Sequence, residues 1–325
     1  MKKTVLAVIM AAAALGAAEV PTLWNETFKS GKLNDSLKWR TRGVTVEKVD
    51  GVNVISMAKS DAVKIKDMGF NLKNVKVEPG KMYKLTITAS VEGPDNLEDM
   101  PMLGRLLQIS NKAKAGKTLA GWRMLFINNS GKHLATDSRP WCCFVRKGKA
   151  DYVQIFYTPP QTGEIVLQIK NHGNVSNVLK FYKFSLEEIN GDVRNVNPDF
   201  SLGVNNCSGY SYGGAKWKLI EENGKVVMQC NGSWVMGDPI PVKPGEKYIL
   251  TATGAKAEND TGAVSIWNLS GKNSISGKRS KSILVFRKDS YETLSMEFIV
   301  PENVTRIRTY LSRGKFSEVK LIRAK

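Results

Sequence analysis

Acidic pairs are the residues of this chain whose type and spacing come closest to catalytic chemistry. They are Glu187-Glu188, Glu221-Glu222 and Glu98-Asp99. Hydrolysis of a glycosidic bond needs two carboxyl groups that face each other across a cleft, whereas adjacent residues on a strand point to opposite faces. The two histidines, His133 and His172, each stand alone in a polar turn. We therefore expect neither a glycosidase pair nor a Ser-His-Asp triad, and we predict that the protein is not an enzyme.

Tryptophans offer a different chemistry, because a flat aromatic ring can stack on the apolar C–H face of a sugar. In the segment around Trp267, Val264 and Ile266 alternate with more polar residues. On a strand this pattern turns the two aliphatic residues toward a core and Trp267 away from it. Trp122 stands at the start of a similar segment, and we expect it to lie on the same face as Trp267. The alternative is that a second sheet or a loop covers this face.

Further candidates for a glycan site lie in loops and basic segments. Tyr210 and Tyr212 stand in a glycine-rich stretch that cannot bury them by itself. Two basic segments, 139–149 and 278–288, carry arginines beside an apolar run. Such a positive edge would attract an acidic glycan. The alternatives are packing roles for the aromatic rings and an ordinary solvated surface for the charges. These candidates are Tyr210, Tyr212, Trp234, Trp141, Arg146 and Arg287.

The four cysteines predict one disulfide bond. Cys207 and Cys230 enclose a loop of the kind that a stabilising disulfide closes, with a contribution of about 3 kcal/mol from loop entropy. Cys142 and Cys143 are adjacent, and they are either buried small hydrophobic residues or a strained vicinal disulfide. A zinc site is not expected because the neighbouring ligands are missing.

The N-terminus and the composition define the compartment. A cationic head, Met1-Lys2-Lys3, is followed by a short apolar run and by small residues before Glu19, which is the pattern of a cleavable signal peptide over residues 1–18. No later run is long enough for a membrane span. The chain has 325 residues with 48 Lys+Arg, 30 Asp+Glu and a formal charge of +18. We expect a secreted or periplasmic protein, bacterial by its signal peptide, and no nucleic-acid partner.

One sequence unit occurs twice along the chain. The segment Val77-Glu78-Pro79-Gly80 through Thr86 recurs as Val242-Lys243-Pro244-Gly245 through Thr251, and Phe184-Ser185-Leu186 recurs as Val319-Lys320-Leu321. Both copies contain short runs rich in β-branched and aromatic residues between turn residues. We predict an all-β protein of two tandem antiparallel β-sandwich domains, residues 19–190 and 191–325.

These residues resemble the jelly-roll carbohydrate-binding modules with a galactose-binding-like fold. The resemblance lies in Asn197-Pro198-Asp199-Phe200-Ser201-Leu202-Gly203 followed by Trp217, in the Val-x-Pro-Gly-x-x-Tyr segments and in the closing strands. It implies a structural calcium held by an Asp of the last strand. That position reads Lys183 in the first copy, which cannot ligate calcium, and Glu318 in the second. We therefore expect the calcium site to be lost in the first copy and to be an option only in the second, and we expect no other cofactor.

The sequence leads to three hypotheses about function. The first is a secreted, non-catalytic protein that binds a polysaccharide or cell-surface glycan through aromatic rings and polar or basic side chains, with acidic glycans preferred if the basic segments lie beside the tryptophan face. The second is a structural or adhesive surface protein that has lost sugar binding. The third is a jelly-roll polysaccharide lyase, which would need Tyr, Lys and Arg converging in a cleft.

Overall fold

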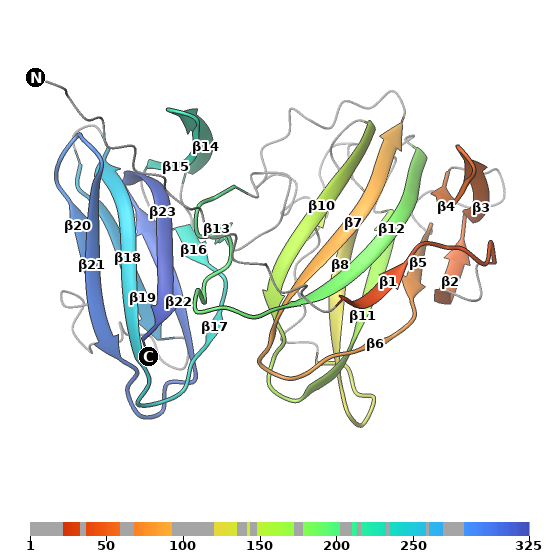
Figure 1. Ribbon diagram of the computed structural model, residues 1–325, viewed down its shortest axis with the longest axis horizontal. Coiled ribbons are helices and arrows are strands. Elements are labelled where there is room, and N and C mark those ends of the chain that lie inside the picture. Colours follow the sequence, from red (N-terminus) through yellow and green to blue (C-terminus); the bar gives the residue numbers. More distant parts are fainter. Residues whose placement is uncertain are drawn as a thin grey trace, which may run out of the picture.

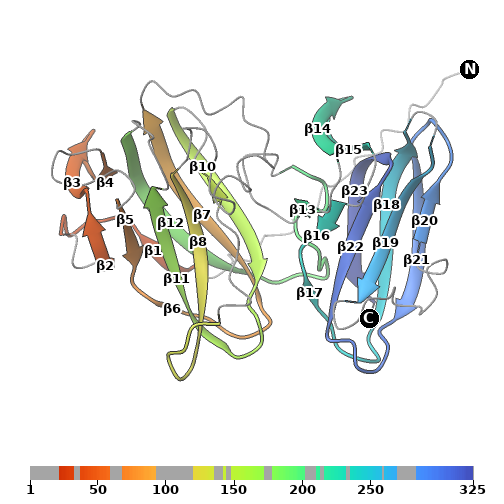
Figure 2. The ribbon, with the colours of Figure 1, turned by 180° about the vertical axis from the view of Figure 1, so that it is seen from behind.

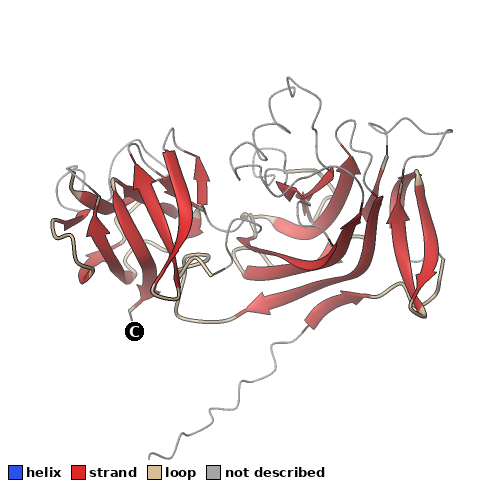
Figure 3. Ribbon diagram, turned by 90° about the horizontal axis from the view of Figure 1, so that it is seen from above, coloured by secondary structure: helices blue, strands red, loops and turns tan. Residues whose placement is uncertain are grey.

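The protein is built from β-strands. The computed structural model describes residues 22–32, 37–58, 68–92, 120–134, 142–143, 148–171, 178–201, 210–212, 216–231, 235–257, 260–268 and 283–324. All regular elements in these ranges are strands, and all their pairings are antiparallel (Figures 1 and 3). None of the described residues belongs to a helix that could cross a membrane. The predicted all-β class is confirmed, and the proposed signal peptide lies outside the described residues.

Strands β1 to β12 form two six-stranded sheets, which we call the first module. One sheet has the order β10-β7-β12-β4-β3 with β1 on β12. The other has the order β2-β5-β11-β8-β9 with β6 on β11. The strands of the first sheet are β1 (Thr22–Glu26), β3 (Val44–Val49), β4 (Val52–Met57), β7 (Met82–Glu92), β10 (Gly148–Tyr157) and β12 (Val178–Ile189). The strands of the second are β2 (Leu37–Arg42), β5 (Gly69–Leu72), β6 (Val75–Lys76), β8 (Ala120–Asn128), β9 (Cys142–Cys143) and β11 (Thr162–Asn171).

Strands β13 to β23 form a second pair of sheets, the second module. One sheet has the order β13-β16-β22-β19-β20 with β17 on β22, and the other has the order β14-β15-β23-β18-β21. The strands of the former are β13 (Tyr210–Tyr212), β16 (Val235–Gly237), β17 (Ile240–Pro241), β19 (Gly262–Asn268), β20 (Ile283–Phe286) and β22 (Arg306–Ser312). The strands of the latter are β14 (Lys216–Glu222), β15 (Lys225–Asn231), β18 (Lys247–Lys256), β21 (Glu292–Ile299) and β23 (Gly314–Arg323).

The two modules repeat the same topology, as the duplicated sequence predicted. The order β10-β7-β12-β4-β3 corresponds strand for strand to β21-β18-β23-β15-β14. The register agrees as well, because Leu186 pairs with Leu85 in the first module and Leu321 pairs with Leu250 in the second. Figure 2 shows β8 and β11 of the first module and β19 and β22 of the second from the side turned away in Figure 1.

The duplicated Pro-Gly segment makes the turn before the long central strand of each module. Gly80 and Gly245 have φ angles of 70° and 80°, and a turn with Pro followed by a residue of positive φ selects glycine at that position. The tyrosine three residues later is buried in both copies. Tyr83 accepts a hydrogen bond from the Glu78 amide, and Tyr248 donates one to Glu246 at 2.7 Å. The repeat thus encodes a turn and the buried tyrosine that forms a hydrogen bond to it.

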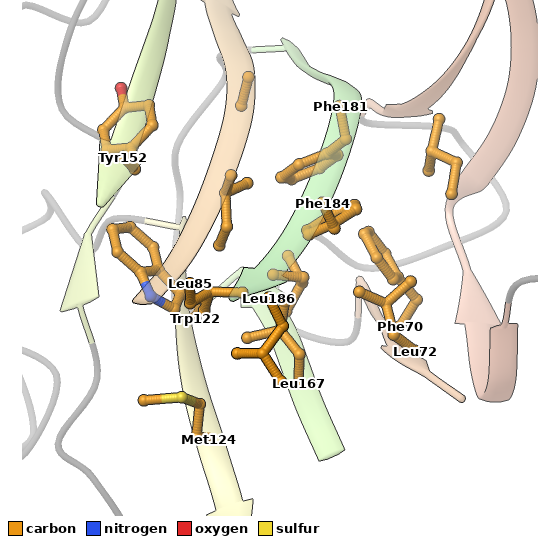
Figure 4. Close-up of a cluster of buried hydrophobic side chains, with 14 of the residues drawn as sticks. Phe70, Leu72, Leu85, Trp122, Met124, Tyr152, Leu167, Phe181, Phe184 and Leu186 are labelled. Atoms are coloured by element: carbon orange, nitrogen blue, oxygen red, sulfur yellow. The ribbon is translucent and has the colours of Figure 1, made fainter. Parts of the chain in front are cut away.

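Each module has its own apolar core between its sheets, made by alternate residues of the strands. In β7, for example, Tyr83, Leu85, Ile87 and Ala89 are all at most 1% exposed. Burial of such side chains is the main favourable contribution to folding, about 25 cal/mol for each Å² removed from water. Figure 4 shows part of the first core, where aromatic rings from β5, β10 and β12 meet aliphatic side chains of both sheets.

The second core extends across the junction between the modules. Met82 and Tyr157 belong to strands of the first module, yet they pack in the hydrophobic cluster of the second. The chain after β12 is also tied to β23, because the Arg194 amide donates to the Leu321 carbonyl at 2.7 Å and the Arg323 amide donates to the Asp192 carbonyl at 3.2 Å. The two modules are therefore joined by a packed junction.

Candidate functional site

The sheet of β19 and β22 has one face in the second core and one outer face. Val264 and Ile266 are fully buried, whereas Trp267 is half-buried on the opposite side of β19. This arrangement confirms the predicted facing of the three residues. Ser265 lies on the outer face as well, where it is buried, and its Oγ accepts a hydrogen bond from the indole Nε1 of Trp267 at 2.9 Å.

A second aromatic ring stands beside Trp267 on this face. Trp267 and Tyr310 of β22 have ring centroids 5.1 Å apart and planes inclined at 41°. The strand register explains the contact, since Ser265 pairs with Tyr310 and Trp267 pairs with Arg308. Diagonal neighbours at this spacing lie within reach of long aromatic side chains. We call the surface made by Trp267, Tyr310 and Arg308 the aromatic face.

Arg308 brings a positive charge next to the two rings. Its Nη1 lies 3.4 Å from the sulfur of Met236 on β16, and its Nε is buried with no hydrogen-bond partner among the described residues. A guanidinium presents five N–H donors in a planar fork. The aromatic face therefore combines ring surface with the hydrogen-bond donors of a guanidinium, which is the pair of functions that a sugar ring with its hydroxyl groups requires.

The matching face of the first module carries a row of polar side chains. Arg123 of β8 donates from Nε to Gln168 of β11 at 2.8 Å, and Gln168 donates in turn to Asn71 of β5 at 3.1 Å. The three residues form a hydrogen-bonded row across three strands. Burial lowers the pKa of the Arg123 guanidinium. The two modules thus present different chemistry on corresponding sheets.

The structure corrects the prediction for Trp122. Its side chain is fully buried in the first core, with its ring edge against Tyr152 and its centroid 5.5 Å away (Figure 4). Trp122 shares the core face of β8 with Met124 and Phe126. An alignment of β8 with the segment of Trp267 therefore needs a one-residue gap before Trp122. A shift of one residue moves a side chain to the other face of a strand. Trp122 offers no surface to a ligand.

The other predicted residues are only partly placed. Arg287 is exposed immediately after β20. Tyr210 and Tyr212 belong to β13, where their backbones pair with Gly237 and Val235, but their side chains are outside the described residues. Trp141, Trp234, Arg146 and Cys207 lie outside them altogether.

Cys230 is a free, fully buried thiol, so the structure does not contain the predicted disulfide bond at this residue. It packs in the second core opposite Trp217 of β14. Burial raises the pKa of the Cys230 thiol to about 12. The residue acts here as a small hydrophobic side chain rather than as half of a cross-link.

Glu318, the predicted calcium ligand, forms an ion pair with Lys320 at 2.5 Å on β23. Among the described residues, no group of three or more His, Cys, Asp and Glu side chains gathers in a way that could hold a metal ion. Calcium at Glu318 remains an expectation from the resemblance.

Tyr310 and Arg308 were missed in the sequence although β22 carries a signal for them. Ile307 and Leu311 are fully buried on the core side of β22, whereas Arg306, Arg308 and Tyr310 alternate with the buried residues on the other face. This alternation indicates a half-buried strand. The identity of the neighbouring strand, and with it the proximity to Trp267, follows only from the sheet order.

Comparison with known proteins returned fold-level similarity alone. No family model matches the chain, and no curated protein matches it in sequence. Among solved structures, the N-terminal CBM22-1-CBM22-2 tandem domain of Paenibacillus barcinonensis Xyn10C is 10% identical, with a TM-score of 0.35, over 95% of this chain and 99% of that one. A carbohydrate-binding module of Cellvibrio mixtus lichenase 5A in complex with cellotriose is 7% identical, with a TM-score of 0.27, over 35% and 91%. The ANXUR2 extracellular domain of Arabidopsis thaliana is 8% identical, with a TM-score of 0.26, over 90% of each chain.

Proposed function

We propose that this is an exported, non-catalytic protein that binds carbohydrate through the aromatic face of its second module. The observation that carries the proposal is the Trp267–Tyr310 ring pair beside Arg308 on the outer side of a sheet. The rings supply stacking surface for a sugar and the guanidinium supplies donors for its hydroxyl or acidic groups. The resemblance to jelly-roll carbohydrate-binding modules implies the same activity.

The described carboxylates favour a binding role over hydrolysis. Glu187 is paired with Lys84 at 3.6 Å, and Glu188 is paired with Lys81 at 3.0 Å. Glu222 bonds to Lys315, and this contact lowers the pKa of Glu222. A general acid for glycoside cleavage instead needs a raised pKa and a second carboxyl group across a cleft.

Two further catalytic chemistries are poorly supported. Ser211 stands in a Gly-x-Ser-x-Gly spacing, but it lies within β13 opposite Met236 rather than on the strand-to-helix turn of a nucleophile elbow. The cleft that contains Tyr157 and Tyr248 also contains lysines and arginines, as a lyase would require. Burial raises the pKa of both tyrosines, whereas a tyrosine that acts as a general base needs a pKa closer to neutral.

The test is binding of the full chain to a panel of neutral and acidic polysaccharides, measured by affinity electrophoresis and calorimetry. Trp267→Ala and Tyr310→Ala should each weaken binding at least about tenfold, which corresponds to about 1.4 kcal/mol. Trp267→Phe, which keeps a ring, should retain part of the affinity, and Val52→Ala, at an exposed position of the first module, should bind like the unchanged protein. Absence of retention on every glycan, or retention of both Ala variants equal to that of the unchanged protein, would overturn the proposal.

A further inference from the structure

A cleft of about 570 Å³ lies at the junction and is lined by residues of both modules. Its lining includes Lys81 and Tyr157 from the first module, Arg194 from the connection, and Lys243, Tyr248 and Arg323 from the second module. We call it the junction cleft. The packing of Met82 and Tyr157 in the second core keeps its two walls together.

The junction cleft is positively charged. Its lining contains four basic residues, Lys81, Arg194, Lys243 and Arg323, and two acidic residues, Asp192 and Glu246. Two of the basic side chains already have carboxylate partners, because Lys81 pairs with Glu188 at 3.0 Å and Arg323 pairs with Glu246 at 3.4 Å. No carboxylate of the described residues forms an ion pair with Arg194, although its side chain is half-buried.

Arg194 is held in place by its surroundings. Its amide donates to Leu321, and its carbonyl accepts a hydrogen bond from the Tyr157 hydroxyl at 2.8 Å. Its Nε is buried and has no hydrogen-bond partner among the described residues. Burial raises the pKa of Tyr157 and of Tyr248, and the nearby charge of Arg194 partly opposes the rise in both, as does a side-chain hydrogen bond from Arg194 in the case of Tyr157. The guanidinium is therefore close to both tyrosines.

A guanidinium with an unsatisfied Nε donor and no carboxylate partner among the described residues, in a partly desolvated cleft, is suited to bind an oxyanion. It remains charged at every physiological pH and bonds bidentately to a planar carboxylate. Such charge-assisted hydrogen bonds are shorter and stronger than neutral ones. A buried N–H donor without an acceptor, as at Arg194 Nε, has a free-energy cost, and a guanidinium with no carboxylate partner would gain from a bound anion.

We propose that Arg194 binds a carboxylate or sulfate group of an acidic glycan in the junction cleft. The glycan part of this assignment rests on the proposed function, whereas the anion site rests on the junction alone. The site is distinct from the aromatic face and uses both modules at once, so each module by itself lacks part of its lining.

The test uses the full chain and calorimetry with trigalacturonate, its methyl ester, and a sulfated neutral trisaccharide. Trigalacturonate should bind at least about tenfold more tightly than the uncharged ester, and Arg194→Gln should abolish this difference. Arg194→Lys, which keeps the charge but not the fork, should retain part of it. Lys225→Gln, at the exposed start of β15 outside the cleft, is the matched control and should change nothing. Arg194-dependent binding of either the carboxylated or the sulfated ligand supports the proposal.

Equal affinity for trigalacturonate and its ester would overturn the anion site. So would an unchanged preference for trigalacturonate over its ester in both Arg194 variants, provided that these variants unfold at the same temperature as the unchanged protein. Equally tight, Arg194-dependent binding of acetate or inorganic sulfate would overturn the assignment to a glycan. The proposals for the aromatic face and for the junction cleft can fail separately. Trp267→Ala should leave the preference for trigalacturonate over its ester intact, and Arg194→Gln should leave retention on neutral glycans intact.

Discussion

The indole Nε1 of Trp122 donates a hydrogen bond to Oε1 of Gln154 at 3.0 Å inside the core of the first module. Trp122 comes from β8 and Gln154 from β10, which belong to opposite sheets. Both residues are almost fully buried. The bond therefore joins the two layers of the sandwich through a polar contact surrounded by apolar side chains.

This contact predicts that Trp122 stabilises the protein and does not bind ligand. Trp122→Ala should lower the free energy of unfolding by about 3–5 kcal/mol because it leaves a large cavity. Gln154→Leu should lower it by about 1–3 kcal/mol because the buried indole N–H loses its acceptor. Urea denaturation measures both. Loss of glycan affinity in a folded Trp122 variant would contradict the prediction.

The thiol of Cys230 should be unreactive in the native protein. With a pKa of about 12, only about one thiol in ten thousand is ionised at pH ~8, and the thiolate is the nucleophile. Iodoacetamide followed by mass spectrometry of the Cys230 peptide should show labelling in guanidinium chloride but not in buffer. A Cys207–Cys230 cross-linked peptide in the unreduced protein would contradict the free thiol.

Glu222 should make stability depend on pH in the acid range. Its hydrogen bonds from Lys315 and Tyr291 lower its pKa below the ordinary 4.5. A carboxyl group with a lowered folded-state pKa contributes stability above its unfolded pKa and loses it as the pH falls through the folded value. Because the pair is partly exposed, Glu222→Gln should cost only about 0.5–1 kcal/mol at pH ~6 and nothing at pH ~2.

The control for this experiment is the neighbouring residue. Glu221 is exposed, and Glu221→Gln should give a stability profile parallel to that of the unchanged protein. Stability is followed by urea denaturation across the pH range. A cost of Glu222→Gln that persists undiminished at the acid end would show that the substitution acts through packing rather than through charge.

Met82 should couple the two modules. Its side chain is 7% exposed and packs in the second core, so Met82→Ala should destabilise the second module, by about 2–5 kcal/mol for a buried methionine. Met57, which packs only in the first core, is the matched control. Alkylation of Cys230 during denaturant titration reports unfolding of the second module. It should occur at lower denaturant in Met82→Ala, and the same shift in Met57→Ala would contradict the prediction.

Much of the fold could be predicted from local patterns. The Pro-Gly turns at Gly80 and Gly245 and the alternation in β7 are local properties, because turn geometry and the two-residue period of a strand depend on neighbouring residues. The duplication then implied that both halves share one architecture. For the same reason, the facing of Val264, Ile266 and Trp267 was predicted correctly.

The residues of the candidate sites required the tertiary structure. The two-residue period of a strand predicts which residues share a face. A one-residue gap in the alignment of the two copies exchanges the two faces, and for this reason Trp122 lies in the core rather than on the face of Trp267. Tyr310 meets Trp267 only because β22 lies next to β19 in the sheet. Arg194, in the connection after β12, lies beside Tyr157 of β10 only because the modules pack against each other. The sequence alone thus determined the strands, the turns and the repeat, while the pairing of distant segments decided which side chains meet, since those contacts join residues that no local period relates.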